Sequence, residues 1–318
     1  MLSSSTALSL YTSFSYVFVL YFASSNVNDY KARRDDPRVI KSRMKHVLTI
    51  MAINIVLIPL LQSKLSGGTV SFKSAVVKLG LIPAAYCVET GGIDWDFTAF
   101  FSGLARSMML VCILFCGPLL DKLLCYALVP GVPLSRMFTD FISESTSIWG
   151  LRNYLFAPFT EELFYTSMLI NNYLLLSNEI TYKTLLLAPP VFFGIAHLHH
   201  GFEMYSLGIY GVVQILFSIF FQMLYTTMFG VFTNFIFIRT GGNLWSCVLT
   251  HSFCNYMGFP QGSELVQELA MASSEASGYY TMIKRLWKWC YLALLIIGAI
   301  EFKNNIWNLT ESTHTILT

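Results

Sequence analysis

Residues 206–238 are 33 consecutive residues without a charged side chain, and most of them are apolar. About 20 such residues in a helix cross the hydrocarbon core of a bilayer. The segment is therefore long enough for one long tilted helix or for two linked helices. A segment of this kind is not accommodated on the surface of a soluble domain, so it predicts that at least this part of the chain lies in a membrane.

The composition extends this prediction to the whole chain. The 318 residues carry only 20 Lys and Arg and 18 Asp and Glu, which is 12% of the chain, while 55% are hydrophobic and the mean hydropathy is +0.58. Soluble domains carry about 25% charged residues. This composition disfavours disordered, nucleic-acid-binding and ordinary cytosolic proteins. We expect an all-α, polytopic membrane protein with residues 1–318 in a single integral membrane domain.

Apolar segments recur along the chain, and we expect about eight transmembrane helices that enclose a polar cavity. Residues 7–23 are interpreted as a retained first span, because no basic region precedes them as in a signal peptide. Further spans are expected at 47–62, 98–120, 154–177, 184–198, 206–238, 243–258 and 286–300, with 75–87 as the weakest candidate. Several are shorter than about 20 residues, which suggests helices that line a cavity inside the protein rather than face lipid.

The orientation follows from a basic segment between the first two spans. Residues 31–45 hold seven of the 20 basic residues: Lys31, Arg33, Arg34, Arg38, Lys41, Arg43 and Lys45. Basic loops stay on the cytosolic side, so we expect this loop in the cytosol and the N-terminus on the other side. A nucleic-acid patch is the alternative, and a position between two membrane segments disfavours it.

Two adjacent carboxylates stand out in the second half of the chain. Residues 150–258 contain only seven charged side chains, and Glu161 and Glu162 lie next to each other in an apolar helix. Ionisable groups at membrane depth are costly, and they usually face a wet cavity where they function. We expect Pro158 to open this helix in its first turn. Neighbours on a helix point about 100° apart, so the two carboxylates should have different roles. A salt-bridged or snorkelling pair is the structural alternative.

Two histidine motifs follow on other apolar segments. His197 shares a helical face with Phe193, whose ring would hold the imidazole in place, whereas His199 and His200 are interpreted as a solvated rim. His251 and Asn255 lie four residues apart, so both point from one face of the 243–258 helix. The structural alternative for this pair is hydrogen bonding between helices. The functional interpretation is an oxyanion hole.

These groups on three helices are sufficient for hydrolysis by an activated water molecule. A buried carboxylate can accept a proton from water, a histidine can orient that water, and fixed donors can stabilise the oxyanion. Neither the H-E-x-x-H pattern of helical zinc proteases nor a G-x-S-x-G nucleophile elbow occurs in the sequence. The 150–258 segment is therefore the expected catalytic core.

Glu161-Glu162, Phe193-x-x-x-His197 and His251-x-x-x-Asn255, in this order, resemble the signature of the CAAX-protease and bacteriocin-processing family of glutamic intramembrane proteases. Three ordered motifs are a specific signal, and the similarity is strongest to the eukaryotic branch, the type II CAAX prenyl proteases (Ras-converting CAAX endopeptidases), most of all to fungal members. The flanking segments that strengthen the match are Asp36-Pro37-Arg38, Ile40-Lys41-Ser42-Arg43, Phe156-Ala157-Pro158-Phe159-Thr160 and Arg239-Thr240-Gly241-Gly242-Asn243-Leu244-Trp245.

The resemblance implies an endopeptidase that removes the last three residues of prenylated Cys-a-a-X proteins, such as Ras-type GTPases and mating-factor precursors. It implies that Glu161 and His197 activate water, that His251 and Asn255 stabilise the oxyanion, and that Glu162 is supporting. Many family members have Arg where this chain has Thr166, so a fixed cation for Glu162 is missing. It also implies a multi-pass protein of the endoplasmic reticulum membrane, an active site accessible from the cytosol, and farnesylated or geranylgeranylated clients.

Other chemistries remain open on the sequence. Zn²⁺ held by Glu161, His197 and His251 is one variant, although we predict no metal cofactor. A thiol mechanism with Cys247 or Cys254 is another variant. A non-catalytic membrane scaffold, or a transporter that uses the glutamate pair as a proton relay, is the alternative from a different class. The expected partners include membrane lipid but no nucleic acid.

Overall fold

The computed structural model describes residues 3–22, 35–87, 90–177, 179–272, 278–312 and 314–316. These residues are almost entirely helical, with one small two-stranded sheet. Within this described part of the chain, four helical segments are long and apolar enough to cross a membrane: Pro37–Leu65, Phe97–Leu114, Tyr182–Leu207 and Val212–Arg239. The chain therefore has the predicted all-α, polytopic membrane architecture, and the number of about eight spans stays a prediction.

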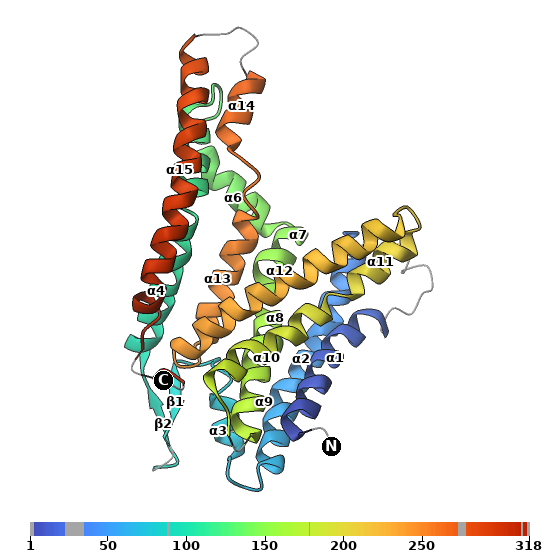
Figure 1. The fold of residues 1–318 in the computed structure, drawn as a ribbon. Coiled ribbons are helices and arrows are strands. Elements are labelled where there is room, and N and C mark those ends of the chain that lie inside the picture. Colours follow the sequence, from blue (N-terminus) through green and yellow to red (C-terminus); the bar gives the residue numbers. More distant parts are fainter. Residues whose placement is uncertain are drawn as a thin grey trace.

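The N-terminal helices α1 (Ser4–Phe22) and α2 (Pro37–Leu65) lie side by side (Figure 1). The basic segment is not simply a loop, because α2 begins at Pro37 and includes its last four basic residues, while Lys31, Arg33 and Arg34 lie outside the described residues. The helix begins here because Pro37 is suited to a first turn and the Asp36 side chain accepts a hydrogen bond from the Arg38 N–H. The basic side chains of α2 thus have fixed positions on a helix.

The expected span at 75–87 is wrong. The structure has a short helix, α3 (Phe72–Val77), followed by an antiparallel hairpin of β1 (Ala84–Tyr86) and β2 (Ile93–Trp95), in which Ala84 pairs with Trp95. Gly80 prevents a continuous helix because its φ is +72°, and a Cβ atom there would lie 1.9 Å from the Gly242 carbonyl oxygen. The chain therefore turns at Gly80 and packs against the turn that precedes α13 (Leu244–Met257).

The expected span at 98–120 is divided into α4 (Phe97–Leu114) and α5 (Cys116–Leu128). Pro118 explains the break, because a proline has no N–H to donate to the carbonyl of residue 114 and its ring clashes with that carbonyl. Two further helices, α6 (Arg136–Thr146) and α14 (Glu264–Ala272), have no counterpart among the expected spans. The last helix, α15 (Gly278–Leu309), is longer than the expected 286–300 and packs against α4 and α5.

Residues 148–176 form one continuous helical path in the middle of the molecule (Figure 1). The path consists of α7 (Ile148–Gly150), η2 (Leu151–Phe156), α8 (Ala157–Glu161), η3 (Glu162–Met168) and α9 (Leu169–Leu176), where η2 and η3 are π-helical. Pro158 lies in the first turn of α8, as predicted, but this turn continues the helical path rather than beginning it, because η2 precedes it. The wider π-helical turns on both sides are the local adjustments by which a helix continues past a proline.

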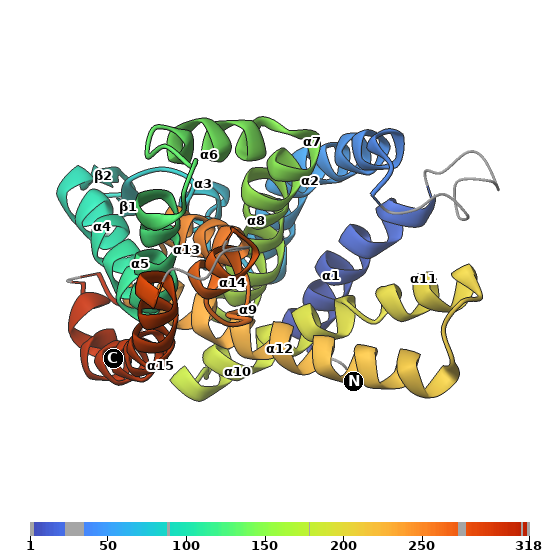
Figure 2. The same ribbon diagram turned by 90° about the horizontal axis from the view of Figure 1, so that it is seen from above.

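The second half of the chain contains α10 (Tyr182–Ala196), α11 (His199–Leu207) and α12 (Val212–Arg239), which cross the molecule obliquely (Figures 1 and 2). The uncharged 206–238 segment is mostly one long helix, since α11 ends at Gly208, where φ is +68°. α10 and α12 approach closely because Gly194 leaves room for Thr227, a position where a Cβ would lie 2.0 Å from the Thr227 hydroxyl. Gly194 thus permits the close crossing of α10 and α12, and this crossing positions His197 at the end of α10.

The main hydrophobic core surrounds η3 and α9. Its fully buried side chains include Leu163, Phe164, Met168, Leu169 and Ile170, and η3 contacts α1, α10, α12 and α13. A helix that is apolar on all sides is expected inside a bundle rather than on its surface. Glu161 and Glu162 lie at the start of the buried segment formed by η3 and α9, so the packing of this segment fixes their positions.

Candidate active site

A cavity of about 330 Å³ lies between α1, α2, the η2–α8 segment, α10, α12 and α13. Five of the six site residues predicted from the sequence line it, and they come from three separate parts of the chain: Glu161, Phe193, His197, His251 and Asn255. The sixth, Glu162, lies behind the cavity wall. The volume of the cavity is within the range of ligand-binding sites. The fold therefore brings the three sequence motifs to one place.

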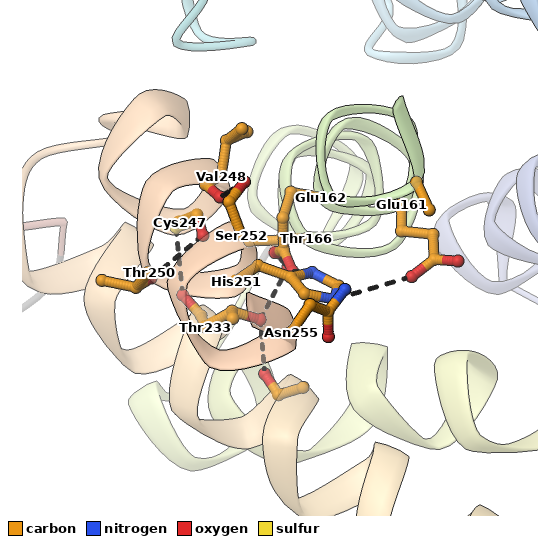
Figure 3. A network of polar contacts seen from close by, with 12 residues as sticks. Glu161, Glu162, Thr166, Thr233, Cys247, Val248, Thr250, His251, Ser252 and Asn255 are labelled. Carbon is orange, nitrogen blue, oxygen red and sulfur yellow. Dashed lines mark hydrogen bonds and ion pairs between the residues drawn. The ribbon is translucent and has the colours of Figure 1, made fainter. Parts of the chain in front are cut away.

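The two adjacent glutamates have different environments, as the helical spacing predicted. The Glu161 side chain faces the cavity and retains 20% of its exposure, whereas that of Glu162 retains 3%. Glu161 is the last residue of α8 and Glu162 is the first residue of η3. Their side chains leave the backbone in different directions (Figure 3). Only Glu161 is positioned to contact a molecule in the cavity.

Glu162 is held by partners on both oxygens. Its Oε1 lies 2.7 Å from His251 Nδ1, and its Oε2 accepts a hydrogen bond of 2.6 Å from the Thr166 hydroxyl (Figure 3). Thr166 in turn lies 3.1 Å from the Thr233 hydroxyl on α12. Thr166 cannot supply a cation, but its hydroxyl lies one helical turn from Glu162 and donates to it. The carboxylate is therefore fixed by a histidine and a threonine instead of an arginine.

His251 connects both glutamates. Because a carboxylate accepts hydrogen bonds, the 2.7 Å contact with Glu162 assigns the proton to Nδ1 and directs Nε2 to the other side of the ring. Nε2 lies 3.8 Å from Glu161 Oε2, and the Phe229 ring contacts the imidazole with a centroid distance of 4.7 Å. Glu162 thus orients the imidazole, and Nε2 shares the cavity wall with the carboxylate of Glu161.

His197 is fixed by its own helix. Its Nδ1 lies 2.8 Å from the Phe193 carbonyl oxygen, and the two rings meet edge to face with centroids 4.8 Å apart. The predicted contact with the Phe193 ring is confirmed, and the backbone carbonyl is an additional partner. A carbonyl only accepts, so Nδ1 carries the proton and Nε2 is the basic atom of the neutral ring. The ring is thereby held in one tautomer.

Asn255 lies on the same face of α13 as His251, as predicted, and lines the cavity. Its side-chain nitrogen donates to the carbonyl of Asn153 on η2, at 2.9 Å. This bond spans two elements and fixes the orientation of the amide. The amide carries a second N–H, which is the donor that an oxyanion hole needs.

The structure also bears on the zinc and thiol mechanisms that the sequence left open. Among the described residues, two groups have at least three potential ligand atoms within 4.8 Å of one another, and Glu161, His197 and His251 form neither of them. Cys247 is buried and donates to the Thr233 carbonyl at 3.3 Å, and neither Cys247 nor Cys254 lines the cavity. The geometry therefore gives no support to a three-ligand zinc site of those residues or to a thiol nucleophile.

Sequence analysis missed a polar cluster on another wall of the cavity. His199 and His200 were interpreted as a solvated rim, but both line the cavity together with Arg43 of α2. Glu203 joins them, with its Oε1 2.7 Å from Arg43 Nη2 and its Oε2 3.1 Å from His200 Nδ1. The only signal in the sequence was the i, i+3 spacing of His200 and Glu203, because the contact with α2 is made between residues 160 positions apart.

Comparisons with known proteins show which proteins the chain is similar to. Residues 143–257 match the family model described as "Type II CAAX prenyl endopeptidase Rce1-like". The chain is 42% identical to CAAX prenyl protease 2 of Saccharomyces cerevisiae over 301 residues, or 93% of both chains. It is 34% identical to the Homo sapiens protein of the same name over 248 residues, which cover 77% of this chain and 68% of that protein. No solved structure matches the chain significantly.

Proposed function

The chain belongs to the type II CAAX prenyl endopeptidase family, and from this premise we propose that it removes the aaX tripeptide of prenylated Cys-a-a-X proteins with water activated by Glu161 and His197. The observation that carries the proposal is the convergence of the three motifs, with Glu161 Oε2 3.8 Å from His251 Nε2 in one cavity. The protein is thus a membrane hydrolase, and the roles of its residues follow from their positions.

Glu161 is the proposed general base. Of the two glutamates it is the one that faces the cavity, so its carboxylate can accept a proton from a water molecule bound there. His197 presents its basic Nε2, since Nδ1 is engaged by the Phe193 carbonyl, and orients the same water. The oxygen of this water attacks the carbonyl carbon of the prenylated cysteine, and the proton on Glu161 is then delivered to the leaving amine.

His251 and Asn255 are the proposed oxyanion donors. The tetrahedral intermediate places a negative charge on the former carbonyl oxygen, and preorganised donors stabilise that charge. Asn255 supplies the amide N–H that Asn153 leaves available. His251 supplies Nε2–H when the ring carries two protons, and the Glu162 carboxylate at Nδ1 is then its counter-ion. Glu162 is a positioning residue in this scheme, because it acts through His251.

The substrate class fits the walls of the cavity. Apolar side chains of α1 and α2, among them Leu20, Met44 and Val47, line it beside the polar groups. A farnesyl or geranylgeranyl chain gains about 0.8 kcal/mol for each CH₂ that leaves water, so an apolar wall next to the catalytic groups favours such clients. Surrounding membrane lipid would hold the rest of the prenyl chain.

The location in the endoplasmic reticulum membrane is proposed on the family resemblance. Cytosolic access to the cavity is supported by Arg43, which lines the cavity and also belongs to the basic segment that the positive-inside rule assigns to the cytosol. Tyr21, near the end of α1, contacts Arg43, whereas the N-terminus lies at the other end of α1 (Figure 1), so the N-terminus would be lumenal. Protection of an N-terminal tag from added protease in sealed microsomes tests this orientation.

Reconstitution tests the activity itself. The purified protein in liposomes is given a farnesylated Cys-a-a-X peptide and the same peptide without the prenyl group, and the released tripeptide is quantified by mass spectrometry. We expect release from the farnesylated peptide and at least tenfold slower release from the other. Absence of any tripeptide would leave the non-catalytic scaffold or transporter as the better interpretation of the glutamate pair.

A further inference from the structure

One wall of the cavity carries a polar cluster to which the proposed chemistry assigns no role. We define the Arg43 cluster as Tyr21, Arg43, His199, His200 and Glu203, from α1, α2 and α11. Arg43, His199 and His200 line the cavity, and the side chains of Arg43 and Glu203 retain only 26% and 17% of their exposure. Charged groups withdrawn from solvent in this way are rare without a function or a compensating partner.

Glu203 holds the cluster together. Its Oε1 accepts hydrogen bonds from Arg43 Nη2 at 2.7 Å and from the Tyr21 hydroxyl at 3.1 Å, while its Oε2 lies 3.1 Å from His200 Nδ1. The Tyr21 ring also packs under the guanidinium, with 5.5 Å between Arg43 Cζ and the ring centroid. These contacts fix the guanidinium at the cavity wall rather than leaving it to extend into solvent.

The hydrogen-bond donors of Arg43 favour an anion in the cavity. Among the described residues, Glu203 is the only hydrogen-bond acceptor of Arg43, and it uses one of the guanidinium's N–H groups. A guanidinium has several further donors in a planar fork, which matches the two oxygens of a carboxylate. A divalent cation on His199, His200 and Glu203 is the competing ligand, but the guanidinium already bound to Glu203 would repel it.

A short path of contacts leads from the catalytic groups to Arg43. The His200 ring centroid lies 5.7 Å from that of His197, His200 Nδ1 lies 3.1 Å from Glu203, and Glu203 lies 2.7 Å from Arg43. Three extended residues span at most about 10 Å. A peptide bond positioned at His197 and Glu161 can therefore have its chain end, three residues further on, at the Arg43 cluster.

We propose that Arg43, positioned by Glu203 and Tyr21, binds the free C-terminal carboxylate of the substrate and so fixes cleavage three residues from the chain end. The inference rests on the proposed function and adds a specificity-determining residue to it. Because the polar cluster fixes the position of the guanidinium relative to Glu161, the enzyme would measure the length of the tripeptide from its terminal charge.

Arg152 is the other arginine of the cavity wall and serves as the matched control. Its Nη1 is paired with Asp35 at 2.9 Å, and its Nε donates to the side chain of Asn153. The carbonyl of Asn153 in turn holds Asn255. Arg152 thus lies beside the proposed oxyanion donor, where the scissile bond sits, and not where the chain end of a tripeptide would lie.

The test compares a farnesylated Cys-a-a-X peptide with its C-terminal carboxamide, which has the same shape without the charge. For each protein in liposomes the ratio of kcat/KM for acid over amide is measured. We expect a ratio of about 10 to 100 for the wild type, the range of one charge-assisted hydrogen-bonded contact. Arg43→Gln should reduce the ratio to about 1, and Arg152→Gln should retain it.

Each outcome decides the inference separately from the activity. Equal kcat/KM values for the acid and the amide in the wild type would overturn the inference but not the endopeptidase activity. If Arg152→Gln loses the acid-over-amide ratio and Arg43→Gln keeps it, Arg152 and not Arg43 binds the carboxylate. Absence of cleavage of either peptide would instead contradict the proposed function. If Arg43→Gln does not fold, inhibition of the wild type by the free tripeptide acid and its amide replaces it, and equal inhibition would overturn the inference.

Discussion

Glu162 and Glu203 are each bonded to the Nδ1 atom of a histidine and to a hydroxyl group, but only Glu203 also binds an arginine. Glu162 has His251 and Thr166 as partners, and its side chain retains 3% of its exposure. Glu203 has His200 and Tyr21, and Arg43 in addition. We therefore propose two purposes for the same histidine–carboxylate pair. Without a cation it orients an imidazole for chemistry, and with a cation it fixes a positive charge for binding.

The histidines provide the largest expected contrast. In His251→Asn and His200→Asn the new amide can replace Nδ1 toward the carboxylate but cannot replace Nε2. We expect His251→Asn to lose about 10²–10³ in kcat/KM, as for removal of an oxyanion donor. His200→Asn should lose less than about tenfold, because the new amide can replace the contact of Nδ1 with Glu203. Similar losses in both variants would show that the two pairs are not functionally distinct.

The carboxylates provide the next contrast. Glu162→Gln weakens the orientation of His251, and the loss of such a supporting group typically costs about tenfold to hundredfold. This loss should appear in kcat, since His251 acts on the transition state. Glu203→Gln should lose about tenfold or less, mainly through KM, since Arg43 retains its charge but loses its fixed position. Steady-state kinetics with the farnesylated peptide separate these effects. A fall in kcat for Glu203→Gln without a rise in its KM would contradict the assignment.

The hydroxyl donors should affect stability more than rate. Thr166→Val keeps the shape of the side chain but leaves Glu162 Oε2 without its 2.6 Å donor in a buried site, which costs about 1–3 kcal/mol in the free energy of unfolding. Tyr21→Phe should cost at most about 0.5 kcal/mol, because Glu203 Oε1 keeps the bond from Arg43. Thermal unfolding of both variants in detergent measures the difference, and equal destabilisation would argue against the distinction in burial.

Metal removal should have the smallest effect. The ligand atoms of His199, His200 and Glu203 lie within 4.8 Å of one another, whereas Glu161, His197 and His251 form no such group in the described part of the chain. We predict that a strong chelator leaves peptide hydrolysis unchanged within twofold to threefold. Activity lost to the chelator and restored by Zn²⁺ would instead return the zinc variant to consideration.

Sequence patterns with a local physical cause predicted how neighbouring side chains are arranged. The i, i+4 spacings of Phe193 with His197 and of His251 with Asn255 fix which side chains share a helical face, and both relations occur in the structure. The 100° offset between Glu161 and Glu162 likewise predicted different roles for the two carboxylates, and their side chains retain 20% and 3% of their exposure. These features depend only on helix geometry, which a sequence determines over a few residues.

Features that depend on tertiary contacts could not be predicted in this way. The helix continues through Pro158 because π-helical turns flank it, and the turn at Gly80 depends on the approach of Gly242. The Arg43 cluster joins α2 to α11 across 160 positions, so no local pattern announces it. Hydropathy alone also gave no indication of α6 and α14, since neither has the length of a span.

The central claim is that Glu161, and not its neighbour, activates the attacking water. The most direct test is tripeptide release from a farnesylated Cys-a-a-X peptide by wild type, Glu161→Gln and Glu162→Gln in liposomes, with equal amounts of folded protein verified by thermal unfolding. The predicted result is a loss of about 10²–10⁴ for Glu161→Gln and a smaller loss for Glu162→Gln. Release by Glu161→Gln within tenfold of the wild type, or a greater loss in Glu162→Gln, would contradict the account.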